Sequence, residues 1–172
     1  MALLLNNQVW MTEDEKALIE DLLRRGYGEK ISNRLLLMPE EALFLMEKRK
    51  SFTVSTERGK KKSFDELYKL FTRLDKLFPL KYNVFRDLRE RGYCVKTGFK
   101  FGSHYRVYAR GKKPGSGHAD WLVQAIPENR IFEANQLSVA VRLAQNVRKK
   151  MIYAVVDKEG DIVYYKVERI TP

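Results

Sequence analysis

Three side chains between residues 105 and 150 have the types needed for acid–base chemistry on a phosphate ester. Tyr108 lies in the segment YRVYARG, His118 follows the segment GKKPGSG, and Lys149 lies in NVRKK. A tyrosine can act as a base where positive charge favours its phenolate, and a histidine titrates near neutral pH and can act as an acid. A lysine supplies fixed positive charge. Together these groups could cleave RNA by attack of its own 2′-hydroxyl, without a metal.

Each of these residues also has a purely structural explanation. A tyrosine on a strand is usually a packing residue, and a histidine after a glycine-rich turn can simply begin a strand. A lysine at the C-terminal end of a helix is favoured by the helix dipole. The chemical interpretation therefore depends on the three residues being brought together by the fold.

The elements that must position them are expected as follows. Tyr108 should share a strand over residues 105–110 with Tyr105, on the opposite face. His118 should open a strand over residues 118–126. Lys149 should close a helix over residues 137–149. Glycines in GKKPGSG would bring His118 to the edge of the sheet, and Lys112 and Lys113 would add positive potential nearby.

Metal and cofactor chemistry is disfavoured by the motifs that the sequence lacks. It has no CxxC, no paired histidines at helical spacing and no dense carboxylate cluster, and GKKPGSG lacks the Walker spacing and a following helix. We therefore expect no metal and no cofactor. The single cysteine, Cys94, excludes an internal disulfide and fits a reducing cytosol.

The charge of the chain favours an anionic partner. The 172 residues carry 33 Lys+Arg against 22 Asp+Glu, a formal net charge of +11, and nucleic acid is the commonest anionic partner of such proteins. Residues 81–172 hold 18 of the basic and 9 of the acidic residues, a net of +9, so the anion-binding face should lie there. The alternative is a solvated surface with ion-pair networks, as in thermophile proteins.

The pattern of the first half predicts a small α/β domain over residues 1–79. Thr12 and Glu15 have the spacing of a helix capping box, and Pro39 followed by two acids is typical of a first helical turn. The expected strands cover residues 3–11, 31–38 and 51–56, and the expected helices follow Thr12, Pro39 and Ser63. Leu77 to Leu80, with Pro79, is the expected boundary, because the residue before a proline disfavours helix.

The second half predicts a domain over residues 80–172 in which a mixed sheet packs on helices, so that the whole chain is of the α+β (mixed α/β) class. A helix over residues 82–91 precedes the sheet. The expected strands cover residues 93–101, 105–110, 118–126, 151–157 and 162–170, with the helix over residues 137–149 between the third and fourth. The segments DLLRRGY and DLRERGY, in the two halves, suggest either related units or a shared way of ending a helix at glycine.

No targeting or membrane segment is expected. The segment MALLLNNQVWM lacks the basic region and cleavage site of a signal peptide, and no apolar run is long enough to span a bilayer. We expect a soluble cytoplasmic protein without a membrane partner.

Three segments in combination resemble the catalytic domain of the archaeal tRNA-splicing endonucleases, also called tRNA-intron lyases. They are RVYARG, GSGHADWLV and AQNVRKKMIYAVVDKEGDIVYYKVERITP. The resemblance implies that Tyr108 is the general base, His118 the general acid, and Lys149 the group that stabilises charge on the scissile phosphate. It also implies metal-independent cleavage at both exon–intron junctions of a precursor tRNA folded as a bulge–helix–bulge, leaving 2′,3′-cyclic phosphate and 5′-hydroxyl ends.

The resemblance further implies how RNA and other subunits are bound. Arg142 matches an arginine that stacks on a flipped bulge base, and the second position of that base sandwich is occupied by Tyr164. Lys112, Lys113 and Arg148 are further RNA-binding candidates. Two cuts at a fixed separation imply a homotetramer, or a heterotetramer with a non-catalytic subunit. The edge strand VYYKVERI would pair between subunits, and the loop IPENRI, with Glu128 as its only acid, would dock a neighbouring dimer.

Two other functions compete with the endonuclease. A non-catalytic RNA-binding subunit of the same fold would keep the basic face and lose members of the triad, all of which are present here. A basic DNA-binding or nucleoid protein would need a recognition helix, and the helix over residues 13–25 is acidic at its start. Preference for bulged RNA over duplex DNA separates the endonuclease from the DNA-binding protein.

Overall fold

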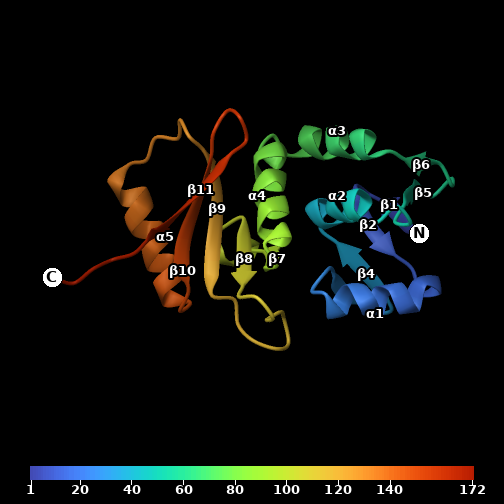
Figure 1. Ribbon diagram of the computed structural model, residues 1–172, viewed down its shortest axis with the longest axis horizontal. Helices are drawn as coiled ribbons and strands as arrows, with labels where there is room; N and C mark the ends of the chain where they lie inside the picture. Colours follow the sequence, from blue (N-terminus) through green and yellow to red (C-terminus); the bar gives the residue numbers. More distant parts are fainter. The chain divides into compact units, whose positions relative to one another are not determined.

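The computed structural model describes residues 1–172 and divides them into two compact units, Met1–Pro79 and Leu80–Pro172 (Figure 1). Each unit combines a sheet with helices, so the mixed α and β class expected from the sequence is confirmed. No helix has both the length and the apolar character needed to cross a bilayer.

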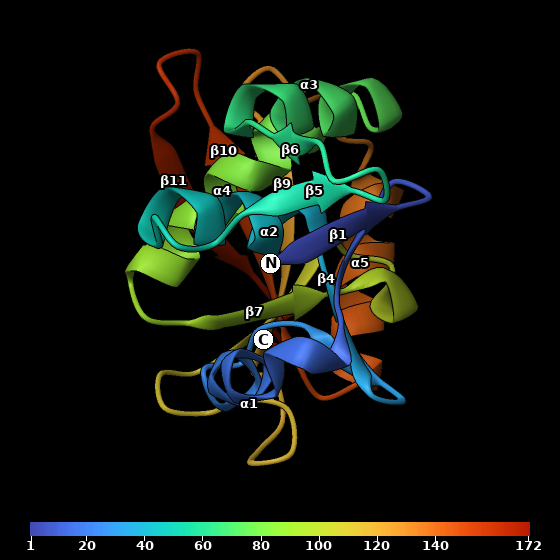
Figure 2. The same cartoon turned by 90° about the vertical axis from the view of Figure 1, so that its right-hand side faces the viewer.

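Unit 1 is built on a six-stranded sheet with the order β3-β4-β2-β1-β5-β6. Its strands are β1 (Ala2–Leu5), β2 (Gln8–Met11), β3 (Glu29–Ile31), β4 (Arg34–Leu37), β5 (Val54–Thr56) and β6 (Lys61–Lys62). Only the pair β1 and β5 is parallel, and Figure 2 shows these two strands side by side. Buried aliphatic residues such as Val9, Leu35 and Leu37 give this sheet one apolar face.

The single opening strand expected over residues 3–11 is wrong, because the segment folds as the hairpin of β1 and β2. Asn6 and Asn7 take left-handed φ values of 47° and 63°. Two such residues between strands form the turn whose twist matches that of the strands, and asparagine tolerates this conformation. The signal was present in the sequence as the pair NN.

The helices of unit 1 begin differently from one another. They are α1 (Lys16–Arg24), preceded by a 3₁₀ turn at Glu13–Glu15, α2 (Pro39–Lys48) and α3 (Phe64–Leu74). The capping box predicted at Thr12 does not form, because the Thr12 side chain accepts no cap hydrogen bond and the carboxylate of Glu15 binds the N-terminal ammonium group instead. The start of α2 at Pro39 is confirmed.

The segments DLLRRGY and DLRERGY end their helices in the same way. Gly26 and Gly92 have left-handed φ values of 77° and 88°. The amide of the following tyrosine donates in each case to a carbonyl five residues back, at 2.8 and 3.0 Å. The likeness of the two segments is therefore explained by a shared helix-ending turn in which glycine supplies the left-handed residue.

Unit 2 contains a five-stranded mixed sheet with the order β11-β10-β9-β8-β7. Its strands are β7 (Cys94–Thr97), β8 (Tyr105–Tyr108), β9 (Trp121–Pro127), β10 (Lys150–Val156) and β11 (Ile162–Val167). The strands β9 and β10 are parallel and are connected by α5 (Ala134–Asn146), whereas the other neighbours are antiparallel. This arrangement places one crossover helix on one face of the sheet.

The helices α4 (Phe78–Glu90) and α5 cover opposite faces of this sheet (Figure 1). On the α5 face, Leu122, Ala144, Met151 and Tyr153 form a buried cluster. On the other face, the Tyr105 ring packs on Phe85 of α4. Each face of the sheet is therefore covered by one helix.

The helix α4 begins at Phe78, so the expectation that the residue before Pro79 is not helical is wrong. Pro79 is the second residue of α4. A proline is tolerated in the first helical turn, where its missing amide would have no partner in the helix.

Candidate active site

The candidate residues meet at one edge of the unit 2 sheet, where β8 ends, β9 and β10 begin, and α5 has just ended. The register pairs Val107 of β8 with Trp121 of β9, and Trp121 with Lys150 of β10. Tyr108, the last residue of β8, and Lys149, the residue before β10, are therefore the next residues outward on either side of the start of β9.

Tyr108 is the last residue of β8 and is 4% exposed. It packs with Cys94 of β7 and with Ala119, and its hydroxyl makes no hydrogen bond within the chain. Tyr105 lies on the opposite face, as expected, and its hydroxyl donates to the carbonyl oxygen of Lys81 at 2.9 Å. The two tyrosines of one strand are thus in chemically different places.

The environment of Tyr108 contains a cation that the sequence reasoning missed. Burial raises the pKa of Tyr108, and the positive charge of Arg106 lowers it. The guanidinium carbon of Arg106 is 6.0 Å from the centre of the Tyr108 ring. The signal available in the sequence was the spacing of two residues, which puts both side chains on one face of a strand.

Lys149 lies outside the helix in which it was expected. The helix α5 ends at Asn146, Val147 caps it, and Arg148 takes a left-handed φ of 55°. This turn directs the Lys149 ammonium group toward the start of β9, where its Nζ donates to the carbonyl oxygen of Ala119 at 3.0 Å. The same Nζ is 5.5 Å from the centre of the Phe101 ring.

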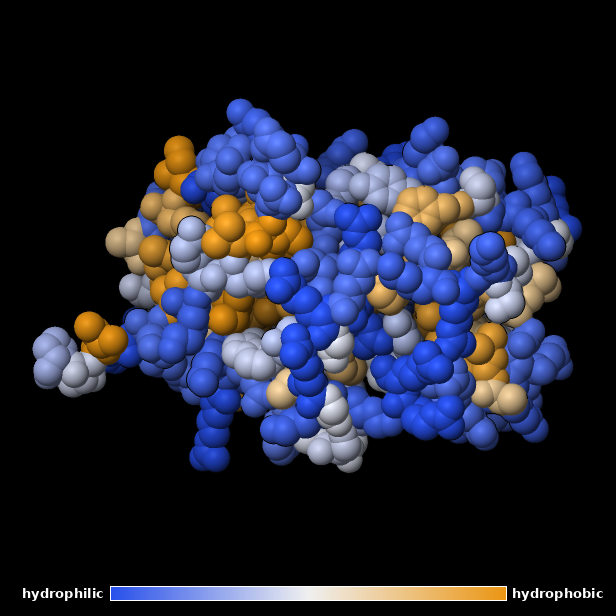
Figure 3. All heavy atoms as spheres, in the orientation of Figure 1, coloured by the Kyte–Doolittle hydropathy of each residue, from blue (hydrophilic) through white to orange (hydrophobic).

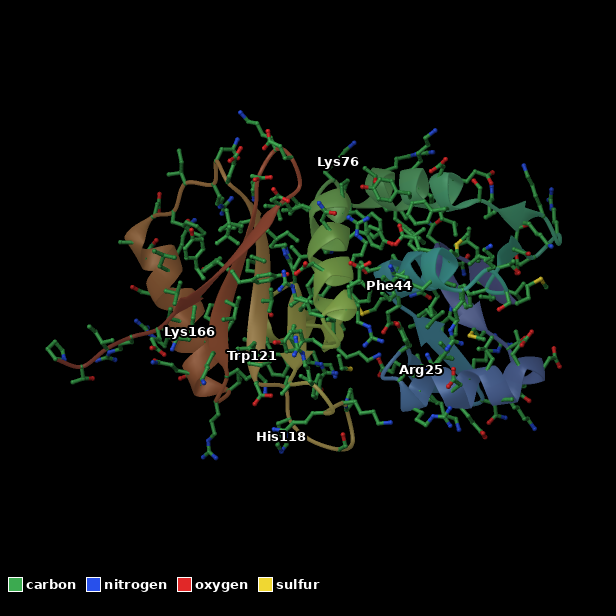
Figure 4. All side chains as sticks on the ribbon, in the orientation of Figure 1. Arg25, Phe44, Lys76, His118, Trp121 and Lys166 are labelled. Carbon is green, nitrogen blue, oxygen red and sulfur yellow. The ribbon has the colours of Figure 1, made fainter.

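His118 is exposed on the loop that precedes β9, so the expectation that it begins the strand is wrong. The strand starts at Trp121, and Figure 4 shows His118 on the loop beyond that residue. Its side chain makes no hydrogen bond within the chain. Gly111 and Gly115, with φ values of 80° and 87°, provide the left-handed turns of this loop.

Ala119 contacts two of the three residues and follows the third in the chain. Its side chain packs with Tyr108, its carbonyl oxygen accepts from Lys149, and its peptide neighbour is His118. The Tyr108 ring and the Lys149 ammonium group therefore contact one residue, and the exposed His118 is next to it in the chain. Such a group offers a base, a cation and an acid for transfer of protons around one phosphate.

Asp120, a residue that the sequence reasoning did not single out, ties this edge together. Its Oδ2 accepts from the amide of Ala109 at 3.1 Å, and its own amide donates to Val107. Its carbonyl oxygen accepts from the amide of Lys150 at 3.0 Å. Asp120 therefore links β8 to β10 beside the loop that carries His118. No group of three or more His, Cys, Asp or Glu side chains is placed to hold a metal ion.

The RNA-binding candidates are distributed over both faces of unit 2. Arg142 is exposed on α5 and lines a groove of about 450 Å³ between this helix and the residues that follow β11. Arg148 and Lys112 are exposed, and Lys113 is half-buried. Tyr164 lies on the α4 face, so one chain does not bring it together with Arg142.

Tyr164 is held on that face by polar contacts. Its hydroxyl is 2.6 Å from Oδ2 of Asp87 in α4, and the guanidinium carbon of Arg91 is 6.0 Å from its ring centre. Burial, reinforced by the hydrogen bond to Asp87, raises the pKa of Tyr164. Its hydroxyl is therefore engaged as a neutral donor.

Comparison with known proteins covers both units. Residues 1–68 match the family model of the tRNA intron endonuclease N-terminal domain, and residues 78–164 match that of the tRNA intron endonuclease catalytic C-terminal domain. A tRNA-splicing endonuclease of Thermococcus onnurineus is 46% identical over 157 residues, which are 91% of this chain and 89% of the relative. A tRNA-splicing endonuclease of Pyrococcus horikoshii is 44% identical over 156 residues, 91% of this chain and 88% of the relative.

A tRNA-splicing endonuclease of Methanosarcina barkeri is 41% identical over 153 residues, which are 87% of this chain and 43% of that longer protein. The resemblance inferred from RVYARG, GSGHADWLV and the C-terminal segment is confirmed. The chain belongs to the tRNA intron endonuclease family.

Proposed function

We propose that this chain excises introns from precursor tRNA by cutting both junctions of a bulge–helix–bulge. The observation that supports the proposal is that Tyr108 packs with Ala119 and Lys149 binds its carbonyl oxygen, directly after His118, within the part of the chain that matches the family's catalytic domain. The family and the names of its relatives make the chain an endonuclease of tRNA splicing. The reaction steps below follow from the chemistry of the three residues.

In the proposed reaction, Tyr108 as phenolate removes the proton from the 2′-hydroxyl at the junction. The 2′-oxygen then attacks the adjacent phosphorus, and the bond from phosphorus to the 5′-oxygen of the next nucleotide breaks. His118, as imidazolium, gives its proton to that leaving oxygen. The products are a 2′,3′-cyclic phosphate and a 5′-hydroxyl, and the step requires neither water nor a metal ion.

The ammonium group of Lys149 would stabilise the negative charge that develops on the phosphate oxygens. It has three N–H donors, so one can stay on the Ala119 carbonyl oxygen while another binds the phosphate. The exposed imidazole of His118 has no hydrogen bond to break before it meets the leaving oxygen. Tyr108 and Lys149 would thus position the phosphate, and the loop before β9 would carry His118 as the acid.

The substrate would be held by the cations of unit 2. Lys112, Lys113 and Arg148 would bind phosphates near the cleavage edge, and Arg142 would stack on an unpaired bulge base above its groove. A side chain on another subunit, Tyr164 included, would have to complete the sandwich, because Tyr164 of the same chain is held on the α4 face. Such recognition reads RNA shape and splayed bases.

Two cuts at a fixed separation require two active sites, so we propose a homotetramer, with a heterotetramer containing a structural subunit as the alternative. An apolar surface on β11 supports subunit pairing. Val163 and Tyr165 are more than half exposed, and Figure 3 shows hydrophobic side chains gathered where β11 runs through unit 2. Exposed apolar patches of this kind mark interaction sites. In this arrangement residues 80–172 catalyse, and residues 1–79 form the N-terminal domain.

The test is incubation of the purified protein with a precursor tRNA bearing a bulge–helix–bulge, in EDTA, followed by analysis of the fragment ends. The proposal predicts cuts at both bulges, with cyclic phosphate and 5′-hydroxyl ends. The matched controls are the Tyr108→Phe protein and an RNA in which the bulges are paired. Binding of bulged RNA without cleavage would favour the non-catalytic subunit, and preference for duplex DNA would favour the DNA-binding protein.

A further inference from the structure

We infer that Arg106 is a positioning residue for Tyr108, holding a positive charge against the phenol ring so that the residue can serve as the base of the cleavage step. The inference rests on the proposed function, in which Tyr108 removes a proton from the 2′-hydroxyl.

The geometry of β8 brings the two side chains together. Arg106 and Tyr108 are two residues apart on one strand and therefore share a face. The guanidinium carbon of Arg106 is 6.0 Å from the centre of the Tyr108 ring. No acidic side chain pairs with Arg106, and its buried Nε has no hydrogen-bond partner within the chain. Its charge is therefore not neutralised by a carboxylate.

A buried tyrosine needs such a charge to act as a base. Burial favours the neutral phenol and raises the pKa of Tyr108, which reduces the fraction present as phenolate at neutral pH. The charge of Arg106 acts in the opposite direction. Lys149, the other cation of the site, directs its Nζ to the carbonyl oxygen of Ala119.

The remaining ionisable groups around Tyr108 come from each neighbouring element. They are Cys94 and Lys96 in β7, His118 and Asp120 on the loop before β9, and Lys149 before β10. Cys94 faces Tyr108 across the strand pair and, like burial, raises its pKa. Lys96 is opposite Arg106 in the register, and Oδ2 of Asp120 accepts from the Ala109 amide. Among the cations near Tyr108, Arg106 is the one that lies over its ring.

The direct test is titration of the Tyr108 phenol by NMR in protein labelled with ¹³C at tyrosine Cζ, with the signal assigned by Tyr108→Phe. Arg106→Met removes the charge at similar length, Arg106→Lys keeps it, and Lys158→Met removes an exposed charge on the β10–β11 turn as the matched control. A unit charge about 6 Å away, in an effective dielectric of about 20 to 40, moves the titration midpoint of the phenol by about one to two pH units.

We expect the Tyr108 midpoint to rise by about one pH unit or more in Arg106→Met, to return toward the wild-type value in Arg106→Lys, and to stay in place in Lys158→Met. An unchanged midpoint in folded Arg106→Met would overturn the inference. If that variant does not fold, Arg106→Gln replaces it, because its amide keeps a polar donor near the buried position.

Single-turnover cleavage against pH gives a second readout that a merely structural role would not move. At pH values below the titration midpoint of Tyr108, Arg106→Met should lower the cleavage rate about tenfold for each pH unit by which that midpoint rises. In protein that already carries Tyr108→Phe, Arg106→Met should not lower the cleavage rate any further. An equal loss in both backgrounds would show that Arg106 does not act through Tyr108. A protein that titrates as expected but cuts no RNA would refute the proposed function alone, whereas one that cuts but keeps the same midpoint in Arg106→Met would refute this inference alone.

Discussion

Tyr105 and Tyr108 are three residues apart on one strand, but removal of their hydroxyl groups should have different effects. The loss from Tyr105 should lower the stability of the protein, and the loss from Tyr108 should lower the rate of RNA cleavage. Tyr105 is 1% exposed, packs on Phe85, and donates a hydrogen bond to the carbonyl oxygen of Lys81. Tyr108 lies on the other face and its hydroxyl makes no hydrogen bond within the chain. The hydroxyl of Tyr105 therefore supports the fold, whereas that of Tyr108 has no hydrogen-bond partner within the chain.

The magnitudes follow from these contacts. Tyr105→Phe removes one buried hydrogen bond, which corresponds to about 1 kcal/mol of the free energy of unfolding. In a cooperative unit of this size such a loss lowers Tm by about 4–8 °C. Tyr108→Phe should leave Tm nearly unchanged, because no hydrogen bond is lost. It should lower the cleavage rate by about 10²- to 10⁴-fold, the usual contribution of a general base.

Thermal unfolding and single-turnover cleavage of precursor tRNA, measured on the same preparations, separate the two roles. The cleavage assay is run well below both Tm values, so that both variants are folded. The reasoning fails if Tyr105→Phe loses as much cleavage as Tyr108→Phe under these conditions. It also fails if Tyr108→Phe cuts at the wild-type rate.

Three further outcomes follow from the structure. His118→Ala should lower the cleavage rate about 10²-fold or more. It should not lower Tm or RNA affinity, because the imidazole is exposed and makes no hydrogen bond within the chain. A parallel loss of RNA affinity would contradict the role of His118 as the acid. Gly98→Ala should destabilise unit 2 by about 3 kcal/mol, because a Cβ would lie 2.8 Å from two backbone atoms. Gly115→Ala has open space around it and should cost about 1 kcal/mol of left-handed strain. Denaturant titration measures both losses, and equal losses would refute the clash at Gly98. The hydrogen bond from Arg49 lowers the pKa of Asp21 to about 2, so unit 1 should lose stability as the pH falls from about 4 to 2. Asp21→Asn should flatten that part of the curve of stability against pH. An unchanged curve would show that Asp21 does not contribute.

Local patterns in the sequence predicted much of the fold. The acidic first turn after Pro39 and the helix between the third and fourth strands of unit 2 follow from capping chemistry and from strand and helix periodicity. The opposite faces of Tyr105 and Tyr108 follow from the two-residue period of a strand. These features depend on neighbours close in the chain, which is why a single sequence was enough.

The geometry of the site depends on contacts that no local pattern encodes. Arg148 takes a left-handed φ that is unusual for a non-glycine residue, and this turn moves Lys149 out of the helix. The position of His118 depends on how Asp120 anchors the loop to β8 and β10. The proposed role of Arg106 depends on the burial of Tyr108 and on the position of the guanidinium group over its ring, and the strand period does not predict either of them.

The central claim is that the RNA supplies its own nucleophile to a site built around Ala119. The most direct measurement uses a precursor tRNA with a single 2′-deoxy nucleotide at one junction and the natural 2′-hydroxyl at the other. We expect cleavage at the unmodified junction and none at the modified one. Cleavage at both junctions would contradict it, because the bond could then be broken without attack by the 2′-oxygen.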